Sequence, residues 1–273
     1  MRPSIDGSDA FLIEGVRCME ERGGPFSLAG RRAVVTGASR GIGAGVAAGL
    51  ARAGAGIVAV QRGTDCPETR AAVAAWGQTC TPVSYDLADG DGIPALAERI
   101  EREYGPVDIL VNAAGITARH PPEQFPREDW DAVIGVNLTA TWLLCQAFGR
   151  GMLARGRGKI VNIASLLSFQ GGVTVPAYAA SKGAVASLTK ALANDWAARG
   201  VNVNAIAPGY IATELTARLQ ADETRNRQIL ERIPSGRWGR PEDLAGAAVF
   251  LASPASDYVQ GEILTVDGGW MGR

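Results

Sequence analysis

The sequence contains a single histidine, His120, and only four cysteines, which form no CxxC pair. Zinc sites in proteins need three or four His, Cys or carboxylate ligands at close spacing. The separated thiols and the lone imidazole cannot supply such a cluster. We therefore expect no metal site, reduced cysteines and an ordinary loop position for His120.

The chain also lacks a surplus of charge of either sign, because 27 Lys and Arg stand against 28 Asp and Glu, for a net charge of −1. Proteins that follow a nucleic-acid backbone or an anionic membrane surface need an excess of cations. No run approaches the roughly 18 apolar residues of a membrane span. These two absences predict no nucleic-acid partner, no membrane partner and a cytoplasmic location.

Apolar, β-branched segments instead alternate with Ala-rich segments of helical period. This alternation is typical of strand–helix–strand units, and it predicts an α/β fold: one Rossmann-type, doubly wound sheet of about seven parallel strands with helices on both faces. The predicted strands are 33–36, 57–61, 81–85, 109–112, 159–163, 201–206 and 262–266. The predicted helices include 43–53, 94–104, 130–153, 177–199 and 241–252.

Residues 1–24 precede the first predicted strand and end in Gly23-Gly24. We interpret them as an N-terminal extension, either a frayed or surface-docked tail or an arm that contacts another subunit. Residues 25–273 contain no repeat, low-complexity tract or linker that would divide them. At this length they predict one domain, which would hold both a dinucleotide site and a catalytic site.

Three glycines stand where the first predicted strand turns into a helix. Glycine at such a turn lets the backbone approach a pyrophosphate, whose charge is met by amides at the helix N-terminus. An ordinary turn is the alternative for a glycine-rich segment taken alone. The cofactor-contacting residues predicted here are Gly37, Ser39, Arg40, Gly41, Ile42 and Gly43.

Polar residues and glycines also follow the later strands, at the carboxyl edge where open parallel sheets bind ligands. Helix caps and turn formers are the alternative explanation for each residue alone. We place Asp86 near an adenine, Asn112 and Gly115 on the adenosine side, and Thr213 near a nicotinamide amide or a phosphate. The further candidates at this edge are Pro208, Gly209 and Ile211.

The end of the second predicted strand discriminates between two nicotinamide cofactors. A carboxylate there would bind the ribose 2′-hydroxyl of NAD and repel the 2′-phosphate of NADP. The sequence reads Gln61-Arg62 and contains no acid at this point. Because Arg62 and Arg40 could offer guanidinium donors to a phosphate, NADP(H) is favoured and NAD(H) remains possible. Two solvated arginines are the alternative.

Tyr178 and Lys182 are four residues apart at the start of a predicted helix, so they lie on one helix face. Ser165 follows the fifth predicted strand, thirteen residues before Tyr178. A surface pair on the helix is the alternative, but a chain with five Tyr and three Lys would rarely place a pair at this spacing by chance.

From Leu28 to Arg273 the sequence resembles the short-chain dehydrogenase/reductase family. The family's order and spacing are present in Thr36-Gly37-x-x-x-Gly41-x-Gly43, Asn112-Ala-Ala-Gly115, Asn137, Ser165, Tyr178-x-x-x-Lys182 and Pro208-Gly209. The resemblance implies hydride transfer between a nicotinamide and a carbinol or carbonyl carbon, a homotetramer, and a substrate lid near 213–240.

The same resemblance implies a role for each member of the catalytic set. Tyr178 would be the general acid and base, and Ser165 would hydrogen-bond to the substrate oxygen. Lys182 would hold the nicotinamide ribose and lower the pKa of Tyr178, while Asn137 would hold a water for proton relay. Tyr178 and Lys182 are thus also predicted cofactor contacts. A capped or solvated Asn is the alternative for Asn137.

Within the family the chain is most similar to bacterial dehydrogenases of gluconate-type and keto-deoxy sugar acids. A sugar acid needs a cation for its carboxylate and polar groups for its hydroxyls. Arg119 is the predicted anchor, Gln170 could bind a hydroxyl, and Tyr210 and Trp238 could close the pocket. A solvated arginine and a core tryptophan are the alternatives for Arg119 and Trp238.

Two other functions stay open from the sequence. One is a 3-oxoacyl carrier-protein reductase or a broad ketone reductase on the same scaffold, and the other is a dinucleotide-binding protein without catalysis. A carrier-protein reductase would present a basic helix surface, yet 142–150 contains only Arg150 as a cation. The complete set of four catalytic residues argues against the non-catalytic protein.

Overall fold

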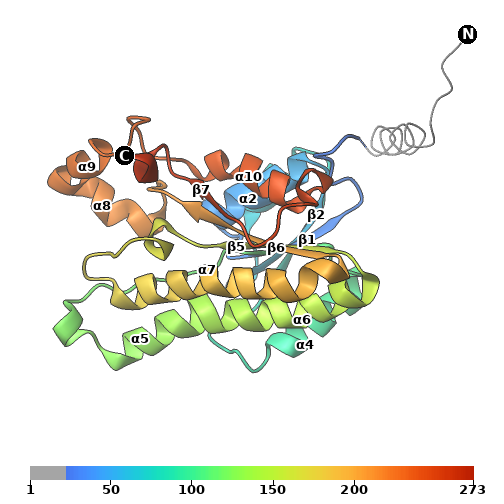
Figure 1. Ribbon diagram of the computed structural model, residues 1–273. Helices are drawn as coiled ribbons and strands as arrows, with labels where there is room; N and C mark the ends of the chain where they lie inside the picture. Colours follow the sequence, from blue (N-terminus) through green and yellow to red (C-terminus); the bar gives the residue numbers. More distant parts are fainter. Residues whose placement is uncertain (1–22) are drawn as a thin grey trace, which may run out of the picture.

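The computed structural model describes residues 23–273, so nearly all of the predicted extension 1–24 lies outside the described residues. Within that range seven strands form one parallel sheet in the order β3-β2-β1-β4-β5-β6-β7 (Figure 1). The strands are β1 Arg32–Thr36, β2 Gly56–Gln61, β3 Cys80–Ser84, β4 Ile109–Asn112, β5 Gly158–Ile163, β6 Val201–Pro208 and β7 Ile263–Val266. The predicted α/β class and doubly wound sheet are confirmed.

The central strands are buried on both faces, which explains their continuous apolar sequence. Along β1, Val34 packs into one core cluster and Val35 into the other, on opposite faces of the sheet. The strand order reverses between β1 and β4, which pair directly through Val34 and Leu110. A crevice at such a reversal is where this class of sheet binds ligands, so the sheet itself fixes the place of the site.

Helices cover both faces of the sheet (Figure 1). One core cluster joins the sheet to α2, α3 and α10, and the other joins it to α4, α6 and α7. The helices on the first face are α2 Gly41–Arg52, α3 Pro67–Ala74 and α10 Ala245–Ala252, and those on the second are α4 Ile93–Tyr104, α6 Ala140–Arg155 and α7 Pro176–Trp196. The remaining helices are α5 Arg127–Ile134, α8 Ala217–Ala221 and α9 Glu223–Leu230.

The predicted helix 130–153 differs from the observed structure. It consists of α5, a π-helical segment Gly135–Thr139 and α6, which together span Arg127–Arg155. This span is long and apolar enough to cross a membrane, contrary to the expectation that no segment approaches that limit. Within its most apolar stretch of 18 residues, 44% is buried inside the protein. Because α6 packs against β4, β5, β6 and α4, it is a core helix of the sheet's second layer.

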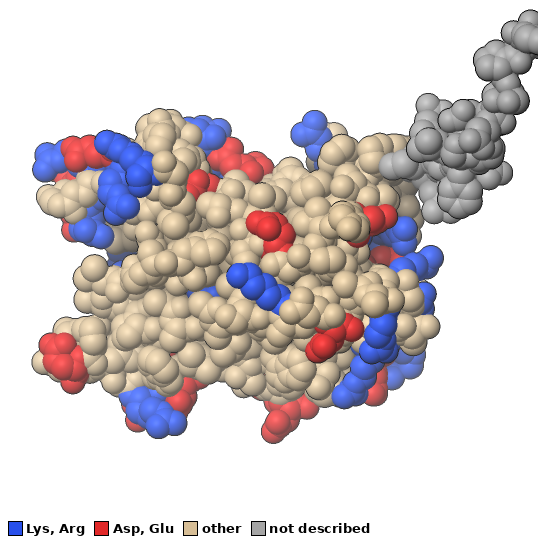
Figure 2. All heavy atoms as spheres, in the orientation of Figure 1, with Lys and Arg blue, Asp and Glu red and all other residues tan. Residues whose placement is uncertain are grey.

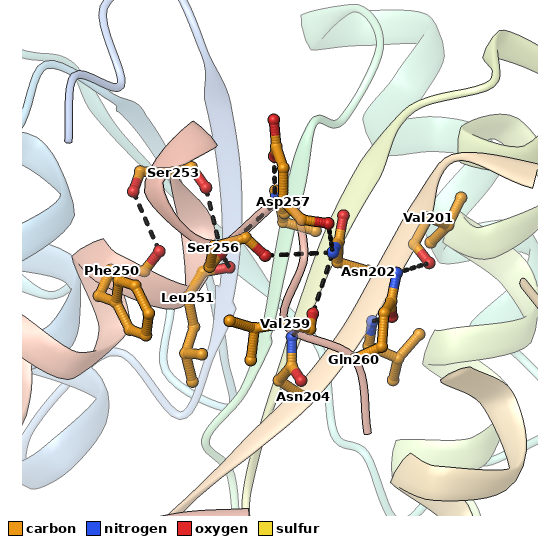
Figure 3. A network of polar contacts seen from close by, with 12 residues as sticks. Val201, Asn202, Asn204, Phe250, Leu251, Ser253, Ser256, Asp257, Val259 and Gln260 are labelled. Atoms are coloured by element: carbon orange, nitrogen blue, oxygen red, sulfur yellow. Dashed lines mark hydrogen bonds and ion pairs between the residues drawn. The ribbon is translucent and has the colours of Figure 1, made fainter. Parts of the chain in front are cut away.

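A buried polar network fixes the edge strand β7 to β6 (Figure 3). The Nδ2 atom of Asn202 donates to the backbone oxygens of Ser256, Asp257 and Val259, and Asn204 Nδ2 donates to the oxygen of Val259. These amides satisfy backbone carbonyls of the connection between α10 and β7. The network therefore orients β6, whose far end reaches the predicted site.

Charged side chains of both signs are spread over the visible face (Figure 2). Comparison with Figure 1 shows that they gather over α8 and α9, whereas the area over α6 and α7 is broad and mostly uncharged. This face has no continuous cationic track of the kind that a nucleic-acid backbone needs.

Candidate active site

The glycine turn between β1 and α2 is held in a conformation that only glycine tolerates. Gly37 and Gly41 have φ values of +64° and +55°. A Cβ on Gly43 would lie 2.3 Å from the backbone oxygen of Gly37, and a Cβ on Gly37 would lie 2.9 Å from the Cα of Ala114. The turn is therefore a bare backbone surface beside the β1–β4 crevice, as a pyrophosphate requires.

We expect Gly43→Ala to destabilise the protein by about 1–3 kcal/mol and to weaken dinucleotide binding, because the backbone atoms of Gly37 and Ala38 cannot yield to the new methyl group. Urea unfolding and equilibrium binding of NADP⁺ measure the two effects. Gly246→Ala is the matched control, since a Cβ at that helical position meets nothing within 4 Å. Equal behaviour of the two variants would contradict the assignment of the turn.

Thr36 connects the glycine turn to the loop after β4. Its buried hydroxyl oxygen accepts hydrogen bonds from the amides of Ala113 and Ala114, both at 3.1 Å. This contact holds the predicted Gly115 beside the crevice, where a Cβ on Gly115 would lie 3.8 Å from Lys182 Nζ. The loop after β4 therefore borders both the predicted adenosine end and the catalytic end of the site.

Asn112 is buried below this wall rather than exposed in it. Its Nδ2 atom donates to Asn162 Oδ1 at 2.9 Å and contacts Cys145 Sγ at 3.3 Å. The amide is thus engaged inside the sheet, and Asn112 Oδ1 is buried with no partner. In this structure only the backbone of Asn112 is available to a cofactor.

The segment after β6 leaves the sheet beside the segment that returns to it, and the two are joined by backbone hydrogen bonds. Ile211 forms a parallel bridge to Gly239, and hydrogen bonds of 2.8 and 2.9 Å join Ala212 to Gly239 and Gly239 to Tyr210. The predicted lid, near 213–240, is therefore a loop whose two ends are fixed together. At its start Thr213 lies close to the glycine turn, 3.4 Å from where a Cβ of Gly41 would be.

The two predicted phosphate-binding arginines differ in their surroundings. Arg40 forms an exposed ion pair with Glu214 of the lid, at 2.7 Å, so its guanidinium already has an anionic partner. Arg62 is exposed and has no ion pair among residues 23–273. Arg62 is therefore the freer donor for an anion beyond β2. The other predicted contacts at this edge that keep some exposed surface are Ser39, Ile42, Asp86 and Gly209, whereas Pro208 is buried.

Ser165, Tyr178 and Lys182 meet at the carboxyl end of β5. Ser165 caps a 3₁₀ turn and accepts from the amide of Leu167 at 3.2 Å. Tyr178 lies in the first turn of α7, after Pro176 at the helix start. One helical turn later, the buried Lys182 Nζ lies 5.7 Å from the centre of the Tyr178 ring and donates to the backbone oxygen of Ile163 at 2.6 Å.

Burial controls the charge of both α7 side chains. It lowers the pKa of Lys182 to about 8, because no acid compensates for the lost solvent. Burial also raises the pKa of Tyr178, while the Ser165 hydroxyl and the positive charge of Arg119 act in the opposite direction. Tyr178 is therefore neutral in the absence of a further positive charge, and its phenolate needs a cation beside it.

Asn137 lies in the π-helical segment, which turns its side chain toward the site. Its Oδ1 accepts from the amide of Ile116 at 2.8 Å, and its Nδ2 donates to the Ile116 oxygen and to Ser181 Oγ. Asn137 thereby connects α7 to the loop after β4. The backbone oxygen of Asn137 also accepts from Thr141 Oγ1 at 2.8 Å, so both its side chain and its backbone hold this part of the structure together.

A pocket opens beside Ser165 and Tyr178, under the lid. Arg119 and Tyr210, two of the predicted substrate residues, line it together with Pro208 and Gly209. Gln170 and Trp238 do not: Gln170 Oε1 accepts from Trp270 Nε1 at 3.5 Å, and Trp238 Nε1 donates to Asn226 at 2.7 Å. The first contact joins the loop after β5 to the C-terminal segment, and the second lies within the predicted lid.

Three polar residues of the pocket, Thr117, Thr216 and Arg225, were not predicted from the sequence. Thr117 lines it with a buried hydroxyl that has no hydrogen-bond partner, and Arg225 lines it from α9. The sequence contains only an indirect signal for Arg225: the apolar Ile229 stands four residues later, at a spacing that shares a helix face, and the structure shows that Ile229 is buried. His120 lies outside this pocket lining and contacts Asp129 at 2.7 Å, which agrees with an ordinary loop position.

The residues present fit a nicotinamide dinucleotide. The glycine turn offers a surface that side chains would fill, and the unpartnered hydroxyl of Thr117 offers a polar contact at the catalytic end. Lys182 Nζ has one backbone partner and keeps further N–H donors. These features lie along one edge of the sheet, as an extended two-base ligand requires.

Comparison with known proteins agrees with this arrangement. Residues 37–271 match a family model described as enoyl-(acyl carrier protein) reductase. The chain is 54% identical over 249 residues to a 2-dehydro-3-deoxy-D-gluconate 5-dehydrogenase of Bacillus subtilis (strain 168), covering 91% of this chain and 97% of the relative. It is 48% identical over 245 residues to a gluconate 5-dehydrogenase of Gluconobacter oxydans (strain 621H), covering 89% of this chain and 96% of the relative.

A solved structure shares the whole fold. The crystal structure of a gluconate 5-dehydrogenase from Burkholderia cenocepacia J2315, in complex with NADP and tartrate, has a TM-score of 0.87 at 43% identity and covers 91% of this chain and 98% of that one. The matched region includes the glycine turn and the Ser165, Tyr178 and Lys182 cluster. This chain therefore belongs to the short-chain dehydrogenase/reductase family.

Proposed function

We propose that the protein is an NADP(H)-preferring oxidoreductase that interconverts a hydroxyl and a keto group of a sugar acid. The observation that carries this proposal is the pocket in which Ser165 and Tyr178 face Arg119 and Arg225, with no acidic residue in the lining. Such a pocket suits an anionic, hydroxyl-rich substrate. The sugar-acid dehydrogenases among the relatives support the same substrate class.

The proton chemistry follows from the geometry of α7. In oxidation, the phenolate of Tyr178 takes the hydroxyl proton of the substrate, and in reduction Tyr178 returns it. Ser165 donates a hydrogen bond to the same substrate oxygen. When bound, a nicotinamide would supply the hydride chemistry at the carbinol or carbonyl carbon. We assign Lys182 to the ribose and to stabilising the phenolate, and Asn137 to holding α7 and the relay water.

The preference for NADP(H) rests on the exposed Arg62 and on the absence of an acid at the end of β2. Gln61 ends the strand. Its side chain is uncharged, so it does not repel a phosphate, and it is buried, so it does not replace a carboxylate at the ribose. The NADP in the solved gluconate 5-dehydrogenase supports the same choice.

Initial rates test the proposal. We expect turnover of gluconate or 2-deoxygluconate with NADP⁺, or of 5-ketogluconate with NADPH, and a kcat/KM for NADP⁺ at least tenfold that for NAD⁺, because the guanidinium of Arg62 contacts the additional phosphate. An acetoacetyl thioester is the comparison substrate. Reduction of the thioester alone would contradict the sugar-acid assignment and leave the fold and the catalytic cluster intact.

A reductase of carrier-protein thioesters is the second candidate, and the description of the matching family model favours it. Against it, the middle of the surface over α6 and α7 carries few charged side chains (Figure 2), whereas an acidic carrier protein would need a basic surface there.

We further propose a cytoplasmic homotetramer. Trp130 on α5 and Trp142 on α6 are 37% and 36% exposed, and more than half of the apolar window in 127–155 is accessible in the single chain. Apolar helix surface of this kind is typical of a subunit contact. Sedimentation equilibrium measures the assembly directly.

A further inference from the structure

We infer that Arg225, on the lid helix α9, holds the carboxylate of the substrate, and that Arg119 instead serves the reacting end. This inference rests on the proposed function and deepens it. Under this inference, the lid is the element that distinguishes substrates with a carboxylate from uncharged ones. The reacting carbon then lies several bonds away from the carboxylate.

The two arginines approach the pocket from different elements. Arg119 belongs to the loop after β4, whereas Arg225 lies in the first turn of α9. Ile229, one turn after Arg225, packs with Leu166 and Trp270, and this contact directs the same face of α9 toward the pocket. The lid is thus built so that this arginine is brought over the substrate.

The guanidinium of Arg225 has capacity for an anion. Its one side-chain hydrogen bond is to the neutral Gln228, from NH1 to Oε1 at 2.9 Å. Among residues 23–273 no carboxylate lies within 4 Å of it, although other arginines of the lid are paired, such as Arg227 with Glu231 and Arg237 with Asp243. A guanidinium has five N–H donors, so a bidentate contact with a carboxylate remains open to Arg225.

Arg119 is the worse place for a carboxylate. Arg119 lines the pocket together with Ser165 and Tyr178, and its positive charge lowers the pKa of the Tyr178 phenol. A substrate carboxylate bound there would cancel this charge and repel the phenolate, which opposes proton abstraction. Arg225 reaches the pocket from α9, a different element, so an anion bound to it leaves the charge of Arg119 free to act on Tyr178.

The length of a sugar acid fits this division. With carbon–carbon bonds of about 1.5 Å, a hydroxyl-bearing carbon four bonds from the carboxyl carbon lies roughly 5 Å from it in an extended chain. Because Arg225, Ser165 and Tyr178 line one pocket, a carboxylate bound to Arg225 leaves a carbon several bonds away as the one to be placed at Ser165 and Tyr178. Oxidation at a carbon next to the carboxylate would instead place the anion beside Tyr178.

Three variants test the inference: Arg225→Gln, Arg119→Gln and, as a matched control on the same helix outside the pocket lining, Arg227→Gln. We expect Arg225→Gln to raise KM for gluconate about tenfold or more with little change in kcat, because a charge-assisted bond formed equally in ground and transition states is lost. Its kcat/KM for the uncharged gluconamide should equal that of the wild type, and Arg227→Gln should match the wild type on both substrates.

Arg119→Gln should behave differently. We expect its kcat to fall and the pH profile of kcat for oxidation to move to higher pH, because the phenol of Tyr178 loses a stabilising charge. The inference alone is overturned if Arg119→Gln raises KM for gluconate selectively over gluconamide while Arg225→Gln does not. A wild type that turns over thioesters and no sugar acid overturns the proposed function itself, and the two failures are thereby distinct.

Discussion

Replacing Tyr178 with Phe should lower kcat by about 10²- to 10⁴-fold, the usual contribution of a positioned general acid or base. The substitution removes one oxygen from a half-buried ring and keeps its packing in the first turn of α7. The other titratable residues that line the pocket are Arg119, Arg225 and Tyr210, and Tyr210 has no lysine one helical turn away to stabilise a phenolate. Steady-state rates with a sugar acid and NADP⁺ measure the loss.

The matched measurements are cofactor affinity and stability. Because the glycine turn and the phenol lie at different places along the sheet edge, we expect the Kd for NADPH to change by less than about threefold. The unfolding midpoint should stay close to that of the wild type, since the phenolic oxygen has no partner on which the fold depends. Ser165→Ala is the companion variant, with a reduced kcat and a similar Kd. Full activity of Tyr178→Phe would sink the proposed mechanism.

The parts of this site that can be predicted from the sequence are those in which the backbone geometry permits only one type of residue. Gly37 and Gly43 are required because a Cβ would collide with backbone, and that requirement is visible as a spacing of glycines after an apolar strand. The central strands are predictable for a similar reason, since burial on both faces demands continuous apolar residues. The pairing of Tyr178 with Lys182 follows from helical geometry alone.

Other parts depend on contacts between segments that are far apart in the chain. Gln170 and Trp238 are polar or aromatic residues near the site in sequence, but their partners Trp270 and Asn226 belong to other turns. Local sequence contains no trace of such pairings. The π-helical segment is of the same kind, because Asn137 satisfies the backbone of Ile116, 21 residues away.

Arg225 illustrates a limit of composition-based reasoning. The lid segment contains several arginines, and each has the same chemistry until the phase of α9 is known. Only the burial of Ile229 distinguishes Arg225 from Arg227, since it decides which side of a short helix faces the pocket. The orientation of the lid is thus a tertiary property, whereas the positions of Ser165 and Tyr178 are fixed by the sheet.

Replacing Lys182 with Met should abolish most activity and also change how stability depends on pH. The ammonium group is buried and paired only with the Ile163 carbonyl, and its pKa falls to about 8 from an ordinary value of 10.5. A difference of this size corresponds to about 3 kcal/mol by which the buried charge destabilises the fold at neutral pH. Methionine has a similar length and no charge, so it removes this penalty together with the hydrogen bond.

The sign of the pH effect follows from the protons bound in each state. Between pH 8 and pH 10.5 the unfolded chain keeps the Lys182 proton and the folded chain has released it, so the free energy of unfolding rises with pH in this window. Below pH 8 both states are protonated and the penalty is fully present. We therefore expect the stability of the wild type to rise relative to that of Lys182→Met from pH 8 to pH 10.5, by up to about 3 kcal/mol.

Urea unfolding of both chains across this range measures the difference, and a Tyr178→Phe background removes the titration of the neighbouring phenol. Other titrating groups are common to the two proteins and cancel. A constant gap between pH 7 and pH 10.5 would show that Lys182 is not held at a lowered pKa. The expected result also bears on function. The buried charge of Lys182 destabilises the fold, but the phenolate of Tyr178 needs a positive neighbour. The same charge that lowers the stability of the free protein therefore stabilises the reactive form of the base.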